Sequence, residues 1–179
     1  MHHVLKSHPD CSSRTVTRID ADIIRASEGR LSVHYRTAGI PVVPLPPLET
    51  LSETMRGDEL WRHTCFEVFV RPAGCEAYVE FNFSPALQWA AYALDGYRHN
   101  RCNLDTAPPA IRTLTGDGDL MLDAELQLEF CAESDWLVGL SAVIEEEDGT
   151  ISYWALAHAP GKPDFHHAGA FALQLPGTP

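Results

Sequence analysis

The sequence predicts an all-β protein, a single-domain antiparallel β-sandwich. Short runs of alternating apolar and polar residues recur along the chain, and Pro, Gly, Asp and Asn interrupt them as in sandwiches and barrels. The run from Leu120 to Phe130 has six apolar residues that would share one face of a strand but would be spread around a helix. A length of 179 residues corresponds to one domain with enough buried surface for a core.

The N-terminal part predicts a hairpin followed by a loop. Residues 14–24 alternate loosely around Val16 and Ile19, and residues 31–35 follow a turn-like Ser-Glu-Gly, so these two segments are expected to pair. Residues 40–59 contain four prolines up to Pro47. Because proline has no amide hydrogen to donate to a strand ladder, this segment is expected to be an extended loop.

A second hairpin is expected from residues 65–70 and 77–83, joined across Arg-Pro-Ala-Gly. Alternation in the return strand places two sets of side chains on opposite faces. One set is Val79, Phe81 and Phe83, and the other is Tyr78, Glu80 and Asn82. Residues 88–94 form the next expected strand, which ends at an Asp-Gly turn.

The C-terminal half predicts four more strands, at residues 120–130, 136–144, 151–157 and 171–175. The whole chain then has about nine or ten strands with little helix. We expect a single domain over residues 12–176, with residues 1–11 and 177–179 as flexible termini.

The charge argues against two classes of partner. The chain has 13 Lys and Arg residues against 25 Asp and Glu residues, a net charge of −12. Nucleic acids and anionic membrane surfaces are bound through concentrated positive charge, so neither is expected as a partner. The segment 113–161 contains no Lys or Arg and therefore carries most of the excess charge. Its acids are expected on an outer sheet face, where they favour solubility and discourage edge pairing.

The cysteines and the N-terminus indicate a cytoplasmic protein. The five cysteines are odd in number and widely spaced, without a CxxC pair, which is typical of free thiols in a reducing compartment. The first twenty residues contain no apolar run of signal-peptide length, and no apolar stretch is long enough to span a membrane.

Two groups of residues suggest chemistry. His158, Asp164, His166 and His167 cluster around two prolines and have the side chains that bind zinc or another divalent ion, so a metal-dependent enzyme is one hypothesis. The alternative is a rigid loop with its polar groups bonded to nearby backbone. Glu67 and Glu80 on adjacent strands are the second group, as a structural, ligand-binding or acid/base pair. No catalytic motif is present, which favours a protein that is not an enzyme.

Aromatic and polar residues that share a surface suggest a sugar site. Trp61 lies in a polar loop, and Tyr78 shares its strand face with Glu80 and Asn82. Pyranose rings stack on aromatic side chains, and their hydroxyls bond to short polar ones. The alternative is a mixed polar rim of the sandwich.

Six segments of this chain resemble bacterial DOMON-like proteins, which are related to family-9 carbohydrate-binding modules. These segments are Leu60–Phe69, Tyr78–Pro85, Trp89–Tyr92, Asp95–Arg98, Tyr153–His158 and Lys162–His167. The resemblance implies a jelly-roll β-sandwich that binds sugar or haem on its concave face. In family-9 modules two tryptophans enclose the sugar, so Trp61 with Trp89 or Trp154 is the expected pair. Haem-binding members use Met and His ligands, for which Met55 and Met121 are the internal methionines.

The sequence therefore predicts a non-catalytic protein that binds a sugar or sugar derivative. Haem binding is the first alternative, and a metal-dependent enzyme is the second. No cofactor is firmly expected. The expected ligand-binding residues are Trp61, His63, Glu67, Tyr78, Glu80, Asn82, Trp89, Arg98 and Trp154.

Overall fold

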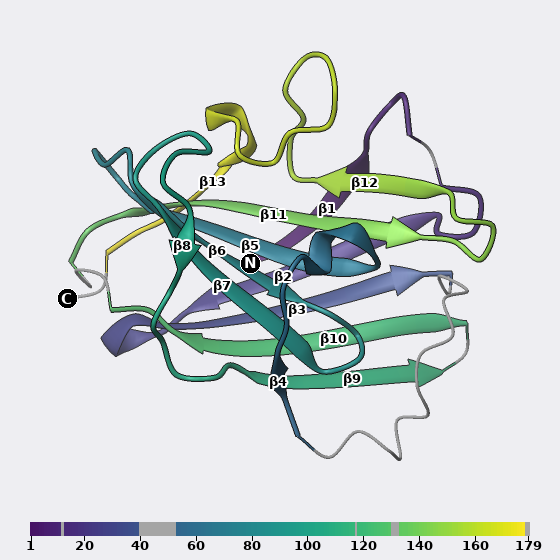
Figure 1. Cartoon of the computed structure of the whole chain (residues 1–179), viewed down its shortest axis with the longest axis horizontal. Coiled ribbons are helices and arrows are strands. Elements are labelled where there is room, and N and C mark those ends of the chain that lie inside the picture. Colours follow the sequence, from purple (N-terminus) through teal and green to yellow (C-terminus); the bar gives the residue numbers. More distant parts are fainter. Residues whose placement is uncertain (12, 40–52, 117, 130–132, 178–179) are drawn as a thin grey trace.

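The computed structural model describes residues 1–11, 13–39, 53–116, 118–129 and 133–177. Over these residues, thirteen strands form one continuous sheet that curls into two layers (Figure 1). The only helical elements in these ranges are the 3₁₀ turns η1 (Ser27–Gly29), η3 (Leu60–Arg62) and η4 (Ala168–Ala170), none of which is long enough to cross a membrane. The predicted all-β sandwich is confirmed, although nine or ten strands was an undercount.

Each layer is antiparallel except for the short parallel pairing of β4 with β7. The first layer has the order β1-β2-β3-β10-β9. Its strands are β1 (His2–Ser7), β2 (Arg18–Arg25), β3 (Arg30–Ala38), β9 (Ala110–Gly116) and β10 (Asp119–Gln127). The second layer has the order β4-β7-β6-β5-β11-β12, with β8 beside β7 and β13 beside β11. Its strands are β4 (Met55–Arg56), β5 (Cys65–Pro72), β6 (Tyr78–Phe83), β7 (Gln88–Leu94), β8 (Cys102–Asn103), β11 (Trp136–Glu145), β12 (Ile151–Ala155) and β13 (Leu173–Leu175).

Strand β1 connects the two layers and corrects the expected N-terminal boundary. Residues 2–5 pair with β2 in the first layer, whereas Lys6 and Ser7 pair with β12 in the second. A strand that changes sheets in this way forms a corner of the sandwich. Residues 2–7 therefore lie within the sheet rather than in a terminus outside a domain beginning at residue 12. The segment was missed because its polar residues, among them His2, His3 and Lys6, do not give a strong strand pattern.

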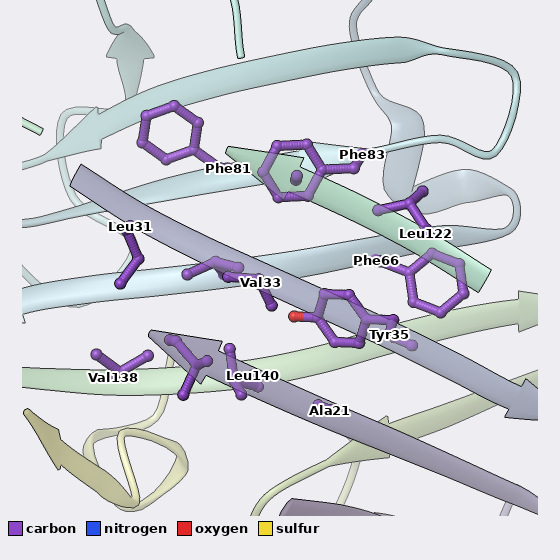
Figure 2. Packing of buried hydrophobic residues seen from close by; sticks show 14 of the residues in the cluster. Ala21, Leu31, Val33, Tyr35, Phe66, Phe81, Phe83, Leu122, Val138 and Leu140 are labelled. Carbon is purple, nitrogen blue, oxygen red and sulfur yellow. The ribbon is translucent and has the colours of Figure 1, made fainter. Parts of the chain in front are cut away.

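The main core fills the space between the layers (Figure 2). Tyr35 and Val33 on β3 face Phe66 on β5, and the rings of Tyr35 and Phe66 lie 5.0 Å apart. The Tyr35 hydroxyl donates to the carbonyl oxygen of Glu67 at 2.7 Å, so this buried polar atom is satisfied across the sandwich. The alternation predicted for residues 120–128 is confirmed, because Leu120, Leu122, Ala124, Leu126 and Leu128 are all buried; residue 130 lies outside the described ranges.

Both predicted hairpins are present. Strand β2 pairs with β3, and β5 pairs with β6. At the first turn, Gly29 has a φ of +77°, and its carbonyl accepts the amide of Leu128 at 2.9 Å. A side chain at Gly29 would meet the Leu128 carbonyl oxygen, so glycine is required here. The predicted proline-rich loop falls largely on residues 40–52, which lie outside the described ranges.

Both faces of the second layer are covered by other parts of the chain. The segments that cover its outer face also form the walls of the pocket described below. Strands β5 and β6 are buried at nearly every position, unlike the half-exposed strands of the first layer. The face of the second layer that turns away from the main core carries a second apolar cluster. Leu60 of η3 and Phe171 beside η4 belong to this cluster, together with Phe69, Tyr78 and Leu94 from the sheet. The long segment between β12 and β13, at the top of Figure 1, thus contributes to the outer cover.

Candidate ligand-binding pocket

A pocket of about 340 Å³ lies on the outer face of the second layer. Its volume falls at the lower end of the roughly 300–1,000 Å³ typical of small-molecule sites. Strands β5, β6, β7, β11 and β12 supply its floor, and η3, the loop after β7 and the segment after β12 supply its walls. The lining residues are Trp61, Glu67, Glu80, Leu94, Arg98, Arg101, Val143, Tyr153, Pro163, Phe165 and His166.

Two buried carboxyl groups form the polar part of the floor. Glu67 and Glu80 are only 2% and 3% exposed. The Ser141 hydroxyl donates to Oε2 of Glu67 at 3.1 Å, and the Asn82 amide donates to Oε1 of Glu80 at 2.8 Å. Burial raises the pKa of Glu67 well above its ordinary value, and the neighbouring charge of Glu80 raises it further. Burial likewise raises the pKa of Glu80, although the Asn82 hydrogen bond opposes this.

Two buried acceptor atoms at this site have no hydrogen-bond partner among the described residues. They are Oε2 of Glu80, which lines the pocket, and Oδ1 of Asn82, which hydrogen-bonds to Glu80 through its amide nitrogen but does not line the pocket. Nε2 of His166 lies 3.9 Å from Oε2 of Glu80, which is beyond hydrogen-bonding distance. Buried polar atoms are rarely left without a partner in folded proteins. The floor therefore has acceptor capacity that a ligand with hydroxyl or amine donors would use.

An aromatic wall rises beside η3. Trp61 contacts Tyr92 edge-on, with ring centroids 5.7 Å apart. The guanidinium of Arg101 lies 4.7 Å from the centroids of both rings. The Tyr92 hydroxyl donates to Oδ1 of Asp58 at 2.5 Å, which ties β7 to the segment preceding η3. Trp61 is thus held by Tyr92 and Arg101 at the edge of the pocket that it lines.

The opposite cover comes from the segment after β12. Phe165 packs edge-on against Tyr153, with ring centroids 6.1 Å apart. Asp164 fixes this segment to the loop after β7, because its carboxylate accepts from the Tyr97 hydroxyl at 2.6 Å and from the Arg98 guanidinium at 2.8 Å. Although partial burial raises the pKa of Asp164, these two donors bring it below its ordinary value, so the ion pair persists at neutral pH.

His166 is neutral and bonded to the sheet. Burial, reinforced by the positive charge of Arg98, lowers the pKa of His166 to about 4. Its Nδ1 lies 2.7 Å from the Tyr78 hydroxyl, which also accepts the Arg98 backbone amide at 3.3 Å. The Tyr78 hydroxyl thus links His166 to the loop after β7, and Nε2 of His166 is directed toward Glu80.

The structure brings together part of the predicted ligand set. Trp61, Glu67, Glu80 and Arg98 line the pocket. Tyr78 and Asn82 do not line it but hydrogen-bond to residues that do. His63 lies apart, since its side chain is 72% exposed and bonds to Glu145 at 2.7 Å.

Two predicted tryptophans belong to the main core rather than to the pocket. Trp89 and Trp154 are 4% and 5% exposed and lie in the cluster between the layers. Trp89 pairs with Phe83 across β6 and β7, and paired residues share a face, so it turns inward. Trp154 faces inward as well, and its indole donates to the Ser152 hydroxyl at 3.0 Å. Trp61 is therefore the one tryptophan of the expected set that a ligand in this pocket would contact.

The predicted metal site is not assembled. Nε2 of His158 bonds to the Lys6 carbonyl at 2.7 Å, and Nδ1 of His167 accepts the Gly169 amide at 3.0 Å, whereas Asp164 and His166 bond toward the pocket as described. Within the described ranges no three His, Cys, Asp or Glu side chains are grouped to hold a metal ion. The alternative of a rigid loop bonded to nearby groups fits this geometry.

The methionines considered for haem are not part of the pocket lining. Met55 is 61% exposed on β4, and Met121 lies on β10 in the first layer, paired with Arg36 and Leu114. Neither residue lines the pocket, and His166 is the only histidine that does. The described lining therefore lacks the Met and His pair expected for haem.

Sequence reasoning missed several lining residues. Arg101 and Phe165 come from loops whose positions depend on long-range contacts, so no local pattern identifies them. The sequence could have identified Tyr153 as a lining residue, because it neighbours Trp154 on a strand and must face the opposite side.

A second hollow of about 450 Å³ lies on the outer face of the first layer. Its lining includes Asp22, His34 and Asp123, and the last two bond to each other. These side chains are between two fifths and half exposed, so the hollow is a groove of solvated polar groups. The smaller pocket has the buried, unpartnered acceptor of Glu80 and is the stronger candidate site.

The fold and the pocket together define a β-sandwich with a small-molecule cavity on one sheet face. No protein-family model matches the chain, and no curated protein matches it by sequence. Among solved structures, it is similar to a candidate carbohydrate-binding protein from Bacteroides uniformis, with a TM-score of 0.67 at 13% identity, over 95% of this chain and 83% of that one. It is also similar to a family-9 carbohydrate-binding module from Caldicellulosiruptor kristjanssonii in complex with cellotriose, with a TM-score of 0.54 at 10% identity, over 90% and 74%. These similarities show the fold.

Proposed function

We propose that this protein binds a sugar or sugar derivative in the pocket on the second layer, without chemically changing it. The observation that carries the proposal is an aromatic wall at Trp61 beside a floor with an unpartnered acceptor at Glu80. A pyranose presents an apolar ring face and a rim of hydroxyl donors, which match these two surfaces. The shared fold with a cellotriose-binding module and the sequence resemblance to DOMON-like proteins support the same class of ligand.

The positions of the acidic residues favour binding over hydrolysis. Glycosidases place two carboxyl groups on either side of the scissile bond. Here Glu67 and Glu80 lie on adjacent strands of one sheet face, so both approach a ligand from the same side. We therefore expect a bound oligosaccharide to be recovered intact after prolonged incubation.

A glycan-array screen followed by calorimetric titration tests the proposal. Cellotriose and glucose are the first probes, and the panel extends to amino sugars and sugar phosphates. We expect at least one saccharide to bind, and Trp61→Ala to weaken that binding. Leu114→Ala is the matched control, because Leu114 is an exposed apolar residue on the first layer. A panel without any binding saccharide would refute the proposal.

A further inference from the structure

The two buried acids of the pocket are not paired with its two arginines. Within the described residues, neither Glu67 nor Glu80 has a Lys or Arg nitrogen within the 4.0 Å of an ion pair. The two lining arginines are directed elsewhere. Arg98 pairs with Asp164 at 2.8 Å, and Arg101 lies against the rings of Trp61 and Tyr92. The deepest charged groups of the pocket are thus acids without a direct cationic partner.

We propose, resting on the sugar-binding function, that the preferred ligand is an amino sugar whose ammonium group bonds to Oε2 of Glu80. An ammonium has three donors and no acceptor, so it can donate to the unpartnered Oε2 of Glu80, which lines the pocket. Its positive charge also offsets the buried acids, which hydroxyl groups do only through their dipoles. The nearby ring of Trp61 adds the attraction of an aromatic face for a cation.

An acidic sugar fits this arrangement less well. Its carboxylate has only acceptors and could not donate to the unpartnered Oε2 of Glu80, and it would repel the ionised form of either buried acid. Arg101 is the lining cation without a carboxylate partner among the described residues. Its guanidinium lies against the aromatic wall, so its charge lowers the pKa of Glu80 without forming an ion pair with it. The geometry therefore favours a cationic over an anionic substituent.

Binding of an ammonium should also be linked to proton release. Burial favours the protonated form of Glu80, whereas an adjacent ammonium favours its carboxylate. The other titratable or charged groups around the floor come from the strands and from both covering loops. They are Cys65, Glu67, Tyr78, Tyr92, Arg98, Arg101, Tyr153, Asp164 and His166.

Calorimetric titration with D-glucosamine, D-glucose and N-acetyl-D-glucosamine tests the inference, at a pH where the free amine is protonated. N-acetyl-D-glucosamine keeps the nitrogen at the same ring carbon, but as an amide without a positive charge. We expect glucosamine to bind about 10- to 100-fold more tightly than either other sugar, the range for a hydrogen bond to a charged group. Repetition in buffers with different ionisation enthalpies should show proton release for glucosamine alone.

A chain of net charge −12 attracts any cation weakly. Two variants distinguish this general attraction from specific binding of the ammonium at Glu80. Glu80→Gln should abolish the preference for glucosamine, so that glucosamine and glucose bind the variant with similar affinity. Glu125→Gln removes the same charge from an exposed position on the first layer and should leave the preference unchanged. Equal affinity of the wild type for all three sugars would overturn the inference while leaving sugar binding intact. Failure of every saccharide to bind would overturn both, and the wild-type comparison decides even if Glu80→Gln does not fold.

Discussion

Replacing the tryptophans one at a time separates the pocket from the core. Trp61 lines the pocket, whereas Trp89 is 4% exposed between the layers. Trp61→Ala should therefore reduce ligand affinity and retain the fold, whereas Trp89→Ala should lower stability and, in the folded fraction, leave affinity nearly unchanged. The contrast tests which face of the second layer each side chain occupies.

The contacts of each residue give the expected magnitudes. Removing a buried aromatic side chain such as Trp89 lowers the free energy of unfolding by about 3–5 kcal/mol. At roughly 2–4 °C per kcal/mol for a chain of this size, the Tm falls by about 6–20 °C. Trp61→Ala removes an edge-on contact with Tyr92 and a cation–π contact with Arg101. Together these contacts contribute about 1–2.5 kcal/mol to the free energy of unfolding. Loss of stacking on the ligand, about 0.5–1.5 kcal/mol, weakens binding by roughly 2- to 12-fold.

Calorimetric titration and chemical denaturation measure these two effects separately. Trp154→Ala is a second core variant, and it should behave as Trp89→Ala does, because Trp154 is 5% exposed in the same cluster. If Trp89→Ala melted like the wild type and lost its ligand, while Trp61→Ala bound normally, the assignment of the pocket to the outer face would be wrong.

Three further outcomes are expected. Glu67→Gln should flatten the fall in Tm as the pH rises above the ordinary glutamate pKa. Burial and then the charge of Glu80 raise the Glu67 pKa, so its stabilising contribution is complete below the ordinary value and is lost as the pH rises through the raised one. An equally steep fall in the variant would contradict this. Asp164→Asn should weaken ligand binding in titration, since it removes the ion pair with Arg98 that fixes the pocket cover, and should lower the Tm by only a few degrees; unchanged affinity would count against that role. Gly29→Ala should lower the free energy of unfolding in urea by more than about 1 kcal/mol, because φ is +77° and a Cβ atom would lie 2.1 Å from a backbone oxygen; a neutral effect would show that the turn can shift.

Where a strand alternates between polar and apolar residues, the sequence correctly predicted which side chains face the core and which face outward. In residues 78–83 the alternation separates Phe81 in the core from Glu80 in the pocket, as the structure shows. Strand β7 lacks this contrast, because Gln88–Leu94 is apolar at nearly every position and buried on both faces. Local pattern therefore left the direction of Trp89 undetermined, and only its pairing with Phe83 fixes it.

The walls of the pocket were harder to predict than its floor. Phe165 and Arg101 are placed by contacts between distant segments, such as the ion pair from Asp164 to Arg98. Such contacts depend on the finished topology rather than on propensity. Asp164 and His166 after β12 were predicted as metal ligands, whereas in the structure their side chains hydrogen-bond to Tyr78, Tyr97 and Arg98 and so hold the pocket cover.

The hydrogen bonds of this face do not by themselves require the two buried acids. A glutamine at Glu67 or Glu80 would still accept from Ser141 or Asn82 and would place no ionisable group in a desolvated site. The floor instead holds two carboxyl groups whose pKa values are raised by burial, which disfavours the folded state as they ionise. A neutral sugar would gain little from this charge, since an amide oxygen also accepts from hydroxyls. A ligand with an ammonium group gains affinity from the charge of the carboxylate itself. The proposed bond from that ammonium to the unpartnered Oε2 atom would therefore explain why residue 80 is an acid.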